Sequence, residues 1–469
     1  MIRRKIAIIV VCAAIVVVGT LLVLPLVLWP FFQSFVVPTG AMAPTILGRH
    51  ADFVCPDCGY TFAAAFDMAQ ATGDAICPNC SFAQNPRRVQ LRGGDHVLVH
   101  KAGGGHIAPG RWDVIVFKNP NDPSVNYIKR VVGLPGETIE LVGGNVTING
   151  RVARKPDAVQ DSLWMLVHDT RWRPRRSNWL PRWEAGAPWA SSGAGFTLDT
   201  PPENGVAWLT YRHLGPDGRL QNILDSYAYN STGSHHQGGS EVVTDLCLRA
   251  PVTLGRAGAA VIIEMRAYKD RFRFELTAEG SDQPTCIYIN GAPAAKSPRG
   301  VLPVGRGAEV LAANVDHKLI LLVDGRRVAT ETALQTPEGD VAYAPTPLTE
   351  AEREWFDSPS ADKPETLAAE VRIGVRGGPA KIAHLRLDRD VYYVNEAMMW
   401  SDGSGMAPGH GTEGNPFMLK EGEYFVLGDN SPRSFDSRLW DLPRPVVPQD
   451  FIIGKAILVQ SSAGTRWIP

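Results

Sequence analysis

The sequence predicts a mainly β protein behind an N-terminal transmembrane helix, and three observations support this fold class. The 46 glycines and 36 prolines among 469 residues favour many turns and short strands over long helices. Apolar runs after residue 35 are mostly short, and turn residues separate them. Residues 6–32, in contrast, contain no charged side chain. That run is long enough to span a bilayer, which needs about 20 apolar residues in a helix.

The charges beside this run predict its orientation. Arg3, Arg4 and Lys5 precede it and should stay in the cytoplasm, so everything after Phe32 should lie outside, next to the membrane lipid. The sequence AMA at 41–43 imitates the small-residue pattern of a signal-peptide cleavage site, but a proline follows it directly. An uncleaved, single-pass anchor is therefore favoured.

Composition excludes some classes of protein. Lys and Arg total 47 and Asp and Glu total 48, so no excess charge favours nucleic acid as a partner. With 44% hydrophobic and 20% charged residues the chain should fold, and its length suggests about three domains. Seven cysteines are too few for a disulfide-based scaffold of this size.

Short β-rich runs follow the anchor and return near the end of the chain. Residues 95–100, 112–117 and 127–132 are separated by Gly, Pro and Asn turns, and 138–148 alternate around a Gly-Gly pair, as in a hairpin. Similar runs resume at residue 423 and end at residue 459. We expect the two regions to form one β-rich unit.

The stretch between these regions has a different character. Residues 151–195 are irregular and contain five tryptophans, interleaved with the five arginines at 171–182. We expect this linker to cover another domain or meet a membrane surface rather than bind nucleic acid. Residues 196–394 contain many short alternating segments and no helical pattern, which predicts a β-sandwich. Their cadence, as in KLILLVDGRRVAT at 318–330, resembles a concanavalin-like or laminin-G-like jelly roll. That resemblance implies a glycan or a protein as a possible ligand of the sandwich.

Two Cys-Pro-x-Cys turns predict a metal centre. Cys55 and Cys58 form one pair, and Cys77 and Cys80 form the other. Each turn offers two sulfurs to one point, so the two pairs complete a tetrahedral shell. Two disulfides are the alternative, since the predicted topology puts the cysteines in an oxidising compartment. We favour one structural zinc because a Cys-Pro-x-Cys turn followed by glycine resembles the turn of zinc ribbons, and we expect no organic cofactor.

Three ordered segments resemble bacterial type I signal peptidase, a membrane-anchored serine endopeptidase that removes signal peptides from exported proteins. They are FVVPTGAMAPTI at 35–46, WDVIVF at 112–117 leading to YIKRVVGLPGE at 127–137, and GDNSPRSFDSRLW at 428–440. The resemblance implies a β-rich catalytic core, signal peptides as partners, and a place in the bacterial inner membrane with the catalytic part outside the cytoplasm.

The resemblance also assigns roles to residues. It makes Lys129 the general base, and a lysine can act so only when apolar surroundings lower its pKa. Ile128 and Val131 supply such surroundings in the sequence. Ser434 would orient this lysine. The supporting residues implied by the third segment are Asp429 and Asn430, and Asp436 paired with Arg438.

The nucleophile position departs from the family pattern. The family has its attacking serine before the methionine of the first segment, and this chain has Ala41 there. The backbone N–H of Ala41 and the hydroxyl of Thr39 correspond to the oxyanion hole. Three explanations stay open: a natural pseudopeptidase that binds signal peptides or surface glycans, an active variant in which Thr39 or another hydroxyl attacks, or a substitution introduced to trap substrate.

These expectations divide the chain into an anchor and four kinds of unit. The predicted division is 1–34 for the cytoplasmic start and anchor, 35–50 and 91–150 for the first part of the catalytic core, 51–90 for the zinc ribbon, 151–195 for the Trp/Arg-rich linker, 196–394 for the sandwich insertion, and 395–469 for the second part of the core.

Overall fold

The structure is a computed structural model that describes residues 31–65, 74–85, 90–101, 108–215, 217–231, 239, 241–332, 335–357, 367–395, 409–462 and 464–469. The predicted transmembrane helix lies outside these residues except for Phe31 and Phe32, and Phe32 already begins a strand. Within the described residues, no helix combines the length and apolar character needed to cross a bilayer. The prediction of a mainly β protein is confirmed, because strands outnumber the short helices throughout the described chain.

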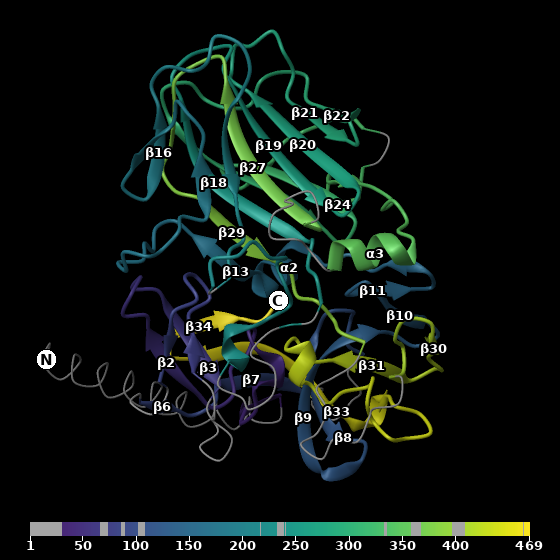
Figure 1. The fold of residues 1–469 in the computed structure, drawn as a ribbon. Helices are drawn as coiled ribbons and strands as arrows, with labels where there is room; N and C mark the ends of the chain where they lie inside the picture. Colours follow the sequence, from purple (N-terminus) through teal and green to yellow (C-terminus); the bar gives the residue numbers. More distant parts are fainter. Residues whose placement is uncertain are drawn as a thin grey trace, which may run out of the picture.

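One antiparallel sheet combines strands from the two ends of the chain (Figure 1). Its core order begins at β1, an edge strand that pairs with β7, and continues through β33 and β8 to β9. In Figure 1 the yellow C-terminal strands lie among the earlier blue ones, beneath the teal and green lobe. The eight strands are β1 (Phe32–Val36), β7 (His96–Lys101), β33 (Ile452–Ser461), β8 (Val114–Asn119), β9 (Asp122–Gly133), β31 (Glu423–Leu427), β32 (Val447–Pro448) and β34 (Gly464–Trp467).

Smaller sheets flank this one. A four-stranded sheet consists of β12 (Arg151–Val152), β11 (Asn145–Ile148), β10 (Thr138–Val142) and β30 (Phe417–Met418). The predicted hairpin is its β10–β11 pair, whose turn residues Gly143 and Gly144 both have positive φ. Glycine takes that conformation without steric cost, so the turn closes here. The cysteine-bearing region adds β2 (His50–Val54), β3 (Thr61–Ala65), β6 (Leu91–Arg92), β4 (Ala75–Ile76) and β5 (Ala83–Gln84).

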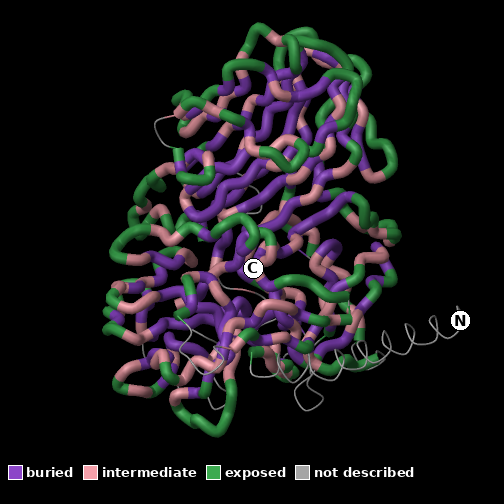
Figure 2. Tube along the Cα trace, turned by 180° about the vertical axis from the view of Figure 1, so that it is seen from behind, coloured by how far each residue is buried: buried purple, intermediate pink, exposed green. Residues whose placement is uncertain are grey.

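Two larger sheets pack face to face in the other lobe and share one hydrophobic core. Figure 2 shows the strands of this lobe as long buried runs. Alternation of side chains along β20 explains how one face of a sheet becomes apolar. Phe272, Phe274 and Leu276 point into the core. Arg273 and Glu275 lie on the other face and form an ion pair. One sheet contains β14 (Trp183–Ala185), β17 (Ala207–Tyr211), β27 (Ala369–Arg376), β19 (Ala260–Ala267), β20 (Asp270–Thr277), β21 (Cys286–Ile289) and β22 (Ala292–Lys296). The other contains β15 (Ala190–Ser192), β16 (Gly195–Leu198), β28 (Ala380–Ile382), β18 (Leu246–Leu254), β23 (Gly307–Val315), β24 (Lys318–Val323), β25 (Arg326–Arg327), β13 (Met165–Asp169), β29 (Arg386–Arg389) and β26 (Val341–Ala342).

The structure differs from the sequence expectations at two places. Strands β13, β14 and β15 belong to the sandwich sheets although they lie in the Trp/Arg-rich stretch predicted to be irregular. Short helices also occur: α2 (Asp157–Leu163) and α3 (Glu350–Asp357), the second inside the region predicted to lack them. Helix α3 buries Phe356 against Val242 and Ala368, a packing interaction that local alternation does not reveal.

Candidate active site and metal centre

Strand β9 carries two adjacent basic residues, Lys129 and Arg130. Register pairs them with Ile115 and Val114 of β8, and strand alternation sends their side chains to opposite faces of the sheet. The two side chains therefore enter different surroundings, one apolar and one ionic.

Lys129 is a buried amine without a hydrogen-bonding or ionic partner among the described residues. Its residue is 5% exposed, and its Nζ forms no hydrogen bond or ion pair with any residue that the structure describes. The ring of Tyr127 lies 5.3 Å from Nζ. Burial lowers the pKa of Lys129 to about 8, while the charge of Asp436 opposes this shift and that of Arg438 adds to it. An amine with such a pKa is partly unprotonated near neutral pH and can accept a proton.

Ala41 lies on a 3₁₀ turn, η1 (Gly40–Met42), beside β9 and beside a second turn, η5 (Ser431–Arg433). Asn430 holds this turn twice: its backbone N–H donates to Ala41 O at 3.0 Å, and its Nδ2 donates to Gly40 O at 2.9 Å. Within the described chain the N–H of Ala41 donates no hydrogen bond. Thr39, which precedes the turn, is exposed.

Ser434 brings a buried hydroxyl to the same place. Its Oγ has no hydrogen-bond partner among the described residues, and the residue is 1% exposed. A Cβ added to Gly428 would lie 2.3 Å from Ser434 Oγ and 2.4 Å from Ala41 O. The hydroxyl and the turn carbonyl therefore both crowd the Cα of Gly428, where only glycine fits.

Two buried ion pairs support the site. Arg438 donates from Nε and Nη2 to the two oxygens of Asp436, at 2.9 and 2.8 Å. Arg130 donates in the same bidentate way to Asp429, at 2.7 and 2.8 Å. The backbone N–H of Gly428 also donates to Asp436 Oδ2 at 3.0 Å. The loop after β31 is the third sequence segment. The Arg438–Asp436 pair lies within this loop, and the Arg130–Asp429 pair fixes the loop on β9.

The structure places Ser434 Oγ and Ala41 O side by side at Gly428, and it buries Lys129 and all four predicted supporting residues. The expected hydrogen bond from Ser434 to Lys129 is not formed, because Ser434 Oγ has no partner among the described residues, and Thr39 lies at the surface. Sequence reasoning missed the partner of Asp429, which is Arg130. The signal was available, because Arg130 follows the predicted base directly in the second segment. It also missed Tyr229 and Asn230, which contact Gly40 and Asn430 from a segment without any recognisable motif.

A family model described as "Signal peptidase, peptidase S26" matches residues 5–164 and 383–460, about half of the chain. The chain belongs to the signal peptidase family, peptidase S26. The match contains all three segments with Ala41, Lys129, Ser434 and the two ion pairs. It omits residues 165–382, where Tyr229, Asn230 and most of the sandwich strands lie.

Several curated members of this family are similar to the chain. Signal peptidase I of Rickettsia canadensis is 31% identical over 119 residues, which are 25% of this chain and 36% of the relative. Signal peptidase I of Pseudomonas fluorescens is 37% identical over 94 residues, or 17% of this chain and 33% of the relative. The chain spans about a third of the length of these relatives.

Solved structures with some likeness to this S26 protein include the carbohydrate binding module CBM66 from Bacillus subtilis, with a TM-score of 0.25 and 10% identity over 45% of this chain and 95% of that one. The exoplasmic/lumenal domain of VIP36 has a TM-score of 0.26 and 8% identity, over 48% of this chain and 89% of that one. A likeness at this level identifies no ligand for the sandwich.

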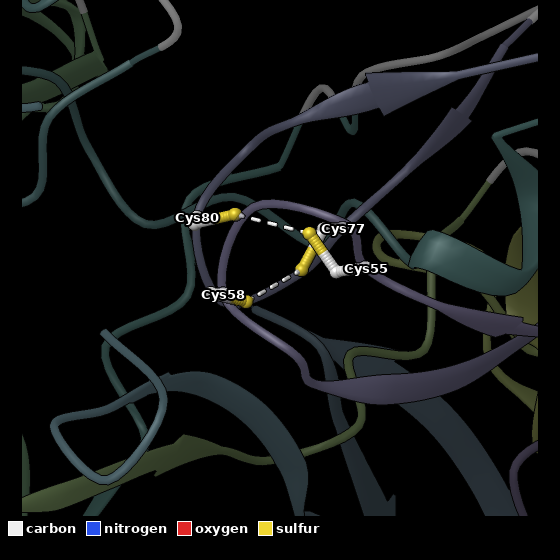
Figure 3. A group of neighbouring side chains, drawn as sticks. All are labelled: Cys55, Cys58, Cys77 and Cys80. Carbon is white, nitrogen blue, oxygen red and sulfur yellow. Dashed lines mark hydrogen bonds between the residues drawn. The ribbon is translucent and has the colours of Figure 1, made fainter. Parts of the chain in front are cut away.

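The four cysteines of the two Cys-Pro-x-Cys turns converge on one point in this S26 protein (Figure 3). Their Sγ atoms lie within 4.8 Å of one another; Cys55 Sγ is 3.6 Å from Cys80 Sγ, and Cys58 Sγ is 3.7 Å from Cys77 Sγ. Four thiolates about 2.3 Å from a tetrahedral zinc would lie roughly 3.8 Å apart, whereas a disulfide needs about 2.05 Å. The cluster could therefore hold one metal ion, with four protein ligands and no open position.

Both turns have the same backbone bonds. Gly59 N–H donates to Cys55 O, and Ser81 N–H donates to Cys77 O, each at 2.8 Å. The residue after each second cysteine has positive φ, which suits Gly59 and which Ser81 also adopts. The two halves thus present their sulfurs in matching geometry.

The Trp/Arg-rich stretch forms hydrogen bonds with both of these turns. Asp57 accepts hydrogen bonds from the backbone of Arg175 and from both the backbone and Nη1 of Arg176. Arg182 Nη2 donates to Ser81 Oγ at 3.0 Å, and Asn79 Nδ2 donates to Trp172 O at 2.8 Å. This stretch covers the cysteine region, as one of its two predicted roles required.

A cavity of about 700 Å³ lies between this stretch and the sandwich edge. Trp172 and Trp179 line it, together with Arg182 and Trp183. Arg182 Nε and Trp183 Nε1 are buried there, and neither donates a hydrogen bond to a described residue. The cavity thus combines aromatic faces with the exposed polar side chains of Arg173, Glu184 and Arg212, a combination suited to a polar ligand.

Proposed function

We propose that this S26 protein binds the signal peptides of exported proteins at the site formed by η1, β9 and η5, and that it does not cleave them as it stands. One observation carries the proposal: a buried, unpaired lysine base and a free Ser434 hydroxyl are retained around a turn whose nucleophile position is Ala41. The binding surroundings are kept while the attacking oxygen is missing.

The edge of the sheet supports peptide binding. Among the described strands β1 pairs only with β7, so one side of its backbone is available for an added strand. An extended substrate segment would hydrogen-bond along β1 and reach η1 with its small residues. The free N–H of Ala41 would then meet a substrate carbonyl.

The missing nucleophile argues against turnover. A serine-type enzyme needs a hydroxyl within hydrogen-bond reach of its base. Ala41 offers no such atom, and Thr39 is exposed whereas Lys129 is buried. A second candidate function, cleavage through Thr39, is favoured by the lowered pKa of Lys129, because a pure binding protein has no need of a base.

The proposed location rests on the sequence. We propose that residues 6–32 anchor the protein in the bacterial inner membrane and that the site faces the outside, where exported chains emerge. Protection of the N-terminus, but not of the site, from protease added outside spheroplasts would support this orientation. Cleavage at both places in intact spheroplasts, or at neither, would contradict it.

The test uses the full chain in detergent with a fluorescent signal peptide and one preprotein. The wild-type protein should bind the peptide saturably and leave the preprotein intact, and Ala41→Ser should cleave it. Loss of a catalytic nucleophile can cost about 10⁶-fold, so a large gain is expected. Lys129→Met in the Ala41→Ser background is the control and should remove the gained cleavage.

Each other outcome is decisive. Wild-type cleavage that Thr39→Ala abolishes would establish the second candidate and overturn the first. Absence of peptide binding by both the wild-type protein and Ala41→Ser would overturn the proposed function. Peptide binding with an inert Ala41→Ser variant would contradict the claim that the catalytic surroundings are retained.

We propose zinc as the ion of the cysteine cluster, because four thiolates in tetrahedral proximity are the donor set that structural zinc prefers. Bound there, zinc would tie the two turns together and stabilise the fold.

Ligand binding at the sandwich is a further candidate function, favoured by the cavity beside Trp179 and Arg182. We propose a glycan as its ligand, since aromatic faces and the exposed polar side chains beside them suit sugar rings and hydroxyls. An oligosaccharide panel should yield a binder whose affinity falls at least tenfold in Trp179→Ala. An absence of binders, or full binding by that variant, would overturn this idea.

A further inference from the structure

A segment from the sandwich half of the chain packs on the turn that carries Ala41. The 3₁₀ turn η3 (Ala228–Asn230) lies between β17 and β18 in sequence. A Cβ added to Gly40 would lie 2.2 Å from a ring carbon of Tyr229, so this ring packs directly on the backbone of Gly40. The Tyr229 hydroxyl donates to Arg49 O at 3.3 Å. The turn is thus covered by a residue outside the three family segments.

Asn230 makes a two-point contact next to it. Its Nδ2 donates to Asn430 Oδ1 at 2.8 Å, and Asn430 Nδ2 donates back to Asn230 Oδ1 at 2.9 Å. The other hydrogen of Asn430 Nδ2 goes to Gly40 O at 2.9 Å. Both asparagines are buried. Only one orientation of the Asn430 amide satisfies all three bonds: Gly40 O requires Nδ2 on its side, and the two-point contact with Asn230 holds the amide there.

This orientation fixes a peptide plane. In a trans peptide the C=O and the following N–H point in opposite directions. Because Asn430 holds Gly40 O, the N–H of Ala41 points away from Asn430, and it donates no hydrogen bond within the described chain. A donor held in advance is what an oxyanion site requires.

We propose that Asn230 is a positioning residue of the S26 site: through Asn430 it aims the N–H of Ala41 at the substrate carbonyl. This inference rests on the proposed function for its substrate. It means that the sandwich half of the chain supplies part of the peptidase-type site.

Contacts on the other side of η3 hold it in place. Ser231 Oγ accepts a hydrogen bond from Ile76 N–H of the cysteine region at 3.1 Å. Arg389 Nη2 of β29 donates to Asp225 O at 2.8 Å and to Ser226 O at 2.6 Å. The segment is therefore braced between the cysteine region and the sandwich before it reaches Asn430.

The test compares Asn230→Asp with Asn290→Asp, the same substitution in a sandwich turn where the side chain bonds to Asp270 and to the backbone N–H of Arg271. A carboxylate at 230 has no donor for Asn430 Oδ1 and repels it. Hydrogen exchange of the full chain, read by mass spectrometry, follows the amides of Ala43 and Asn430, which donate to Gly40 O and Ala41 O. We expect both to exchange about tenfold faster in Asn230→Asp at pH 8 and at the wild-type rate in Asn290→Asp.

Acid should reverse the defect. A protonated aspartic acid has one donor and one acceptor, so it restores the two-point contact with Asn430. Because position 230 is buried, the pKa of a carboxyl there should rise above its ordinary value, and the exchange difference from wild type should shrink at pH 5. If Asn230→Asp fails to fold, Asn230→Ser, which cannot make both contacts, is measured in its place.

Activity provides an independent measurement. In the Ala41→Ser background, Asn230→Asp should lower kcat about 10²-fold and change KM less than threefold, because the affected donor acts on the transition state. Unchanged exchange at Ala43 and Asn430 would overturn the inference whether or not Ala41→Ser cleaves. Failure of the wild-type chain to bind signal peptide would instead overturn the proposed function and leave the exchange result to stand.

Discussion

Arg130 and Asp429 form a bidentate ion pair with both side chains fully buried, and they are 299 positions apart in the sequence. Arg130 Nη1 also donates to Trp112 O at 2.7 Å, so its charge is hydrogen-bonded on several sides. The pair joins β9 to the loop after β31, the two elements that carry the candidate base and its supporting residues.

Breaking this pair should be costly. Asp429→Ala leaves the Arg130 guanidinium buried without its counter-charge, and we expect a loss of about 3 to 5 kcal/mol in the free energy of unfolding. Urea denaturation measures it. Glu184→Ala removes an exposed ion pair with Arg212 and should cost less than about 1 kcal/mol. Equal effects of the two substitutions would contradict the importance of the buried pair.

The lysine base should make stability depend on pH. The pKa of Lys129 is about 8 in the folded protein and about 10.5 in the unfolded chain, so between these values the unfolded chain binds more protons. The wild-type protein should therefore gain up to about 3 kcal/mol relative to Lys129→Met as pH rises from 8 to 10.5. Parallel stability curves for the two proteins would show that Lys129 is not desolvated.

Gly428→Ala should disrupt the site without changing any charge. The new Cβ would overlap Ser434 Oγ and Ala41 O, so we expect the free energy of unfolding to fall by about 1 to 3 kcal/mol. The same substitution should abolish the cleavage gained by Ala41→Ser. Gly93→Ala is the control, since a Cβ there meets nothing within 4 Å. If Gly428→Ala and Gly93→Ala change the free energy of unfolding equally, Gly428 has no close contact with Ser434 Oγ and Ala41 O.

Metal removal should destabilise the cysteine region. A strong chelator should release about one zinc per chain, and Cys77→Ser should prevent zinc binding because it removes one of four thiolates. Elemental analysis and thiol titration measure both. Cys286→Ser, outside the cluster, should keep the zinc. Zinc-free protein whose four thiols are oxidised would establish disulfides instead.

A second pH effect should arise at Asp245. Burial raises the pKa of Asp245 to about 7, and the charges of Asp390 and Asp316 add to this effect. The folded protein then holds this proton more tightly than the unfolded chain, so stability should fall as pH rises from about 4 to about 7. Asp245→Asn should reduce this slope in denaturation measured across that range. An unchanged slope would show that Asp245 ionises normally.

Local patterns predicted much of this structure, and non-local contacts account for the rest. The β10–β11 hairpin follows from a Gly-Gly turn, and the cysteine cluster follows from two spacings. Strand β13 was missed because it pairs with β29, more than 200 residues later, and its own sequence alternates weakly. The same reason hides the contact of Asn230 with Asn430, since nothing in either segment identifies a distant amide partner.

The long separation between Arg130 and Asp429 has a consequence for biosynthesis. A ribosome that adds about 5 to 20 residues per second needs roughly 15 to 60 s to pass from one to the other. Throughout that interval Lys129 has been made, but the loop with Asp429, Asp436 and Arg438, whose charges act on its pKa, has not. A nascent or truncated chain therefore has no assembled site, and the proposed binding of signal peptides would begin only when synthesis of the chain is almost finished.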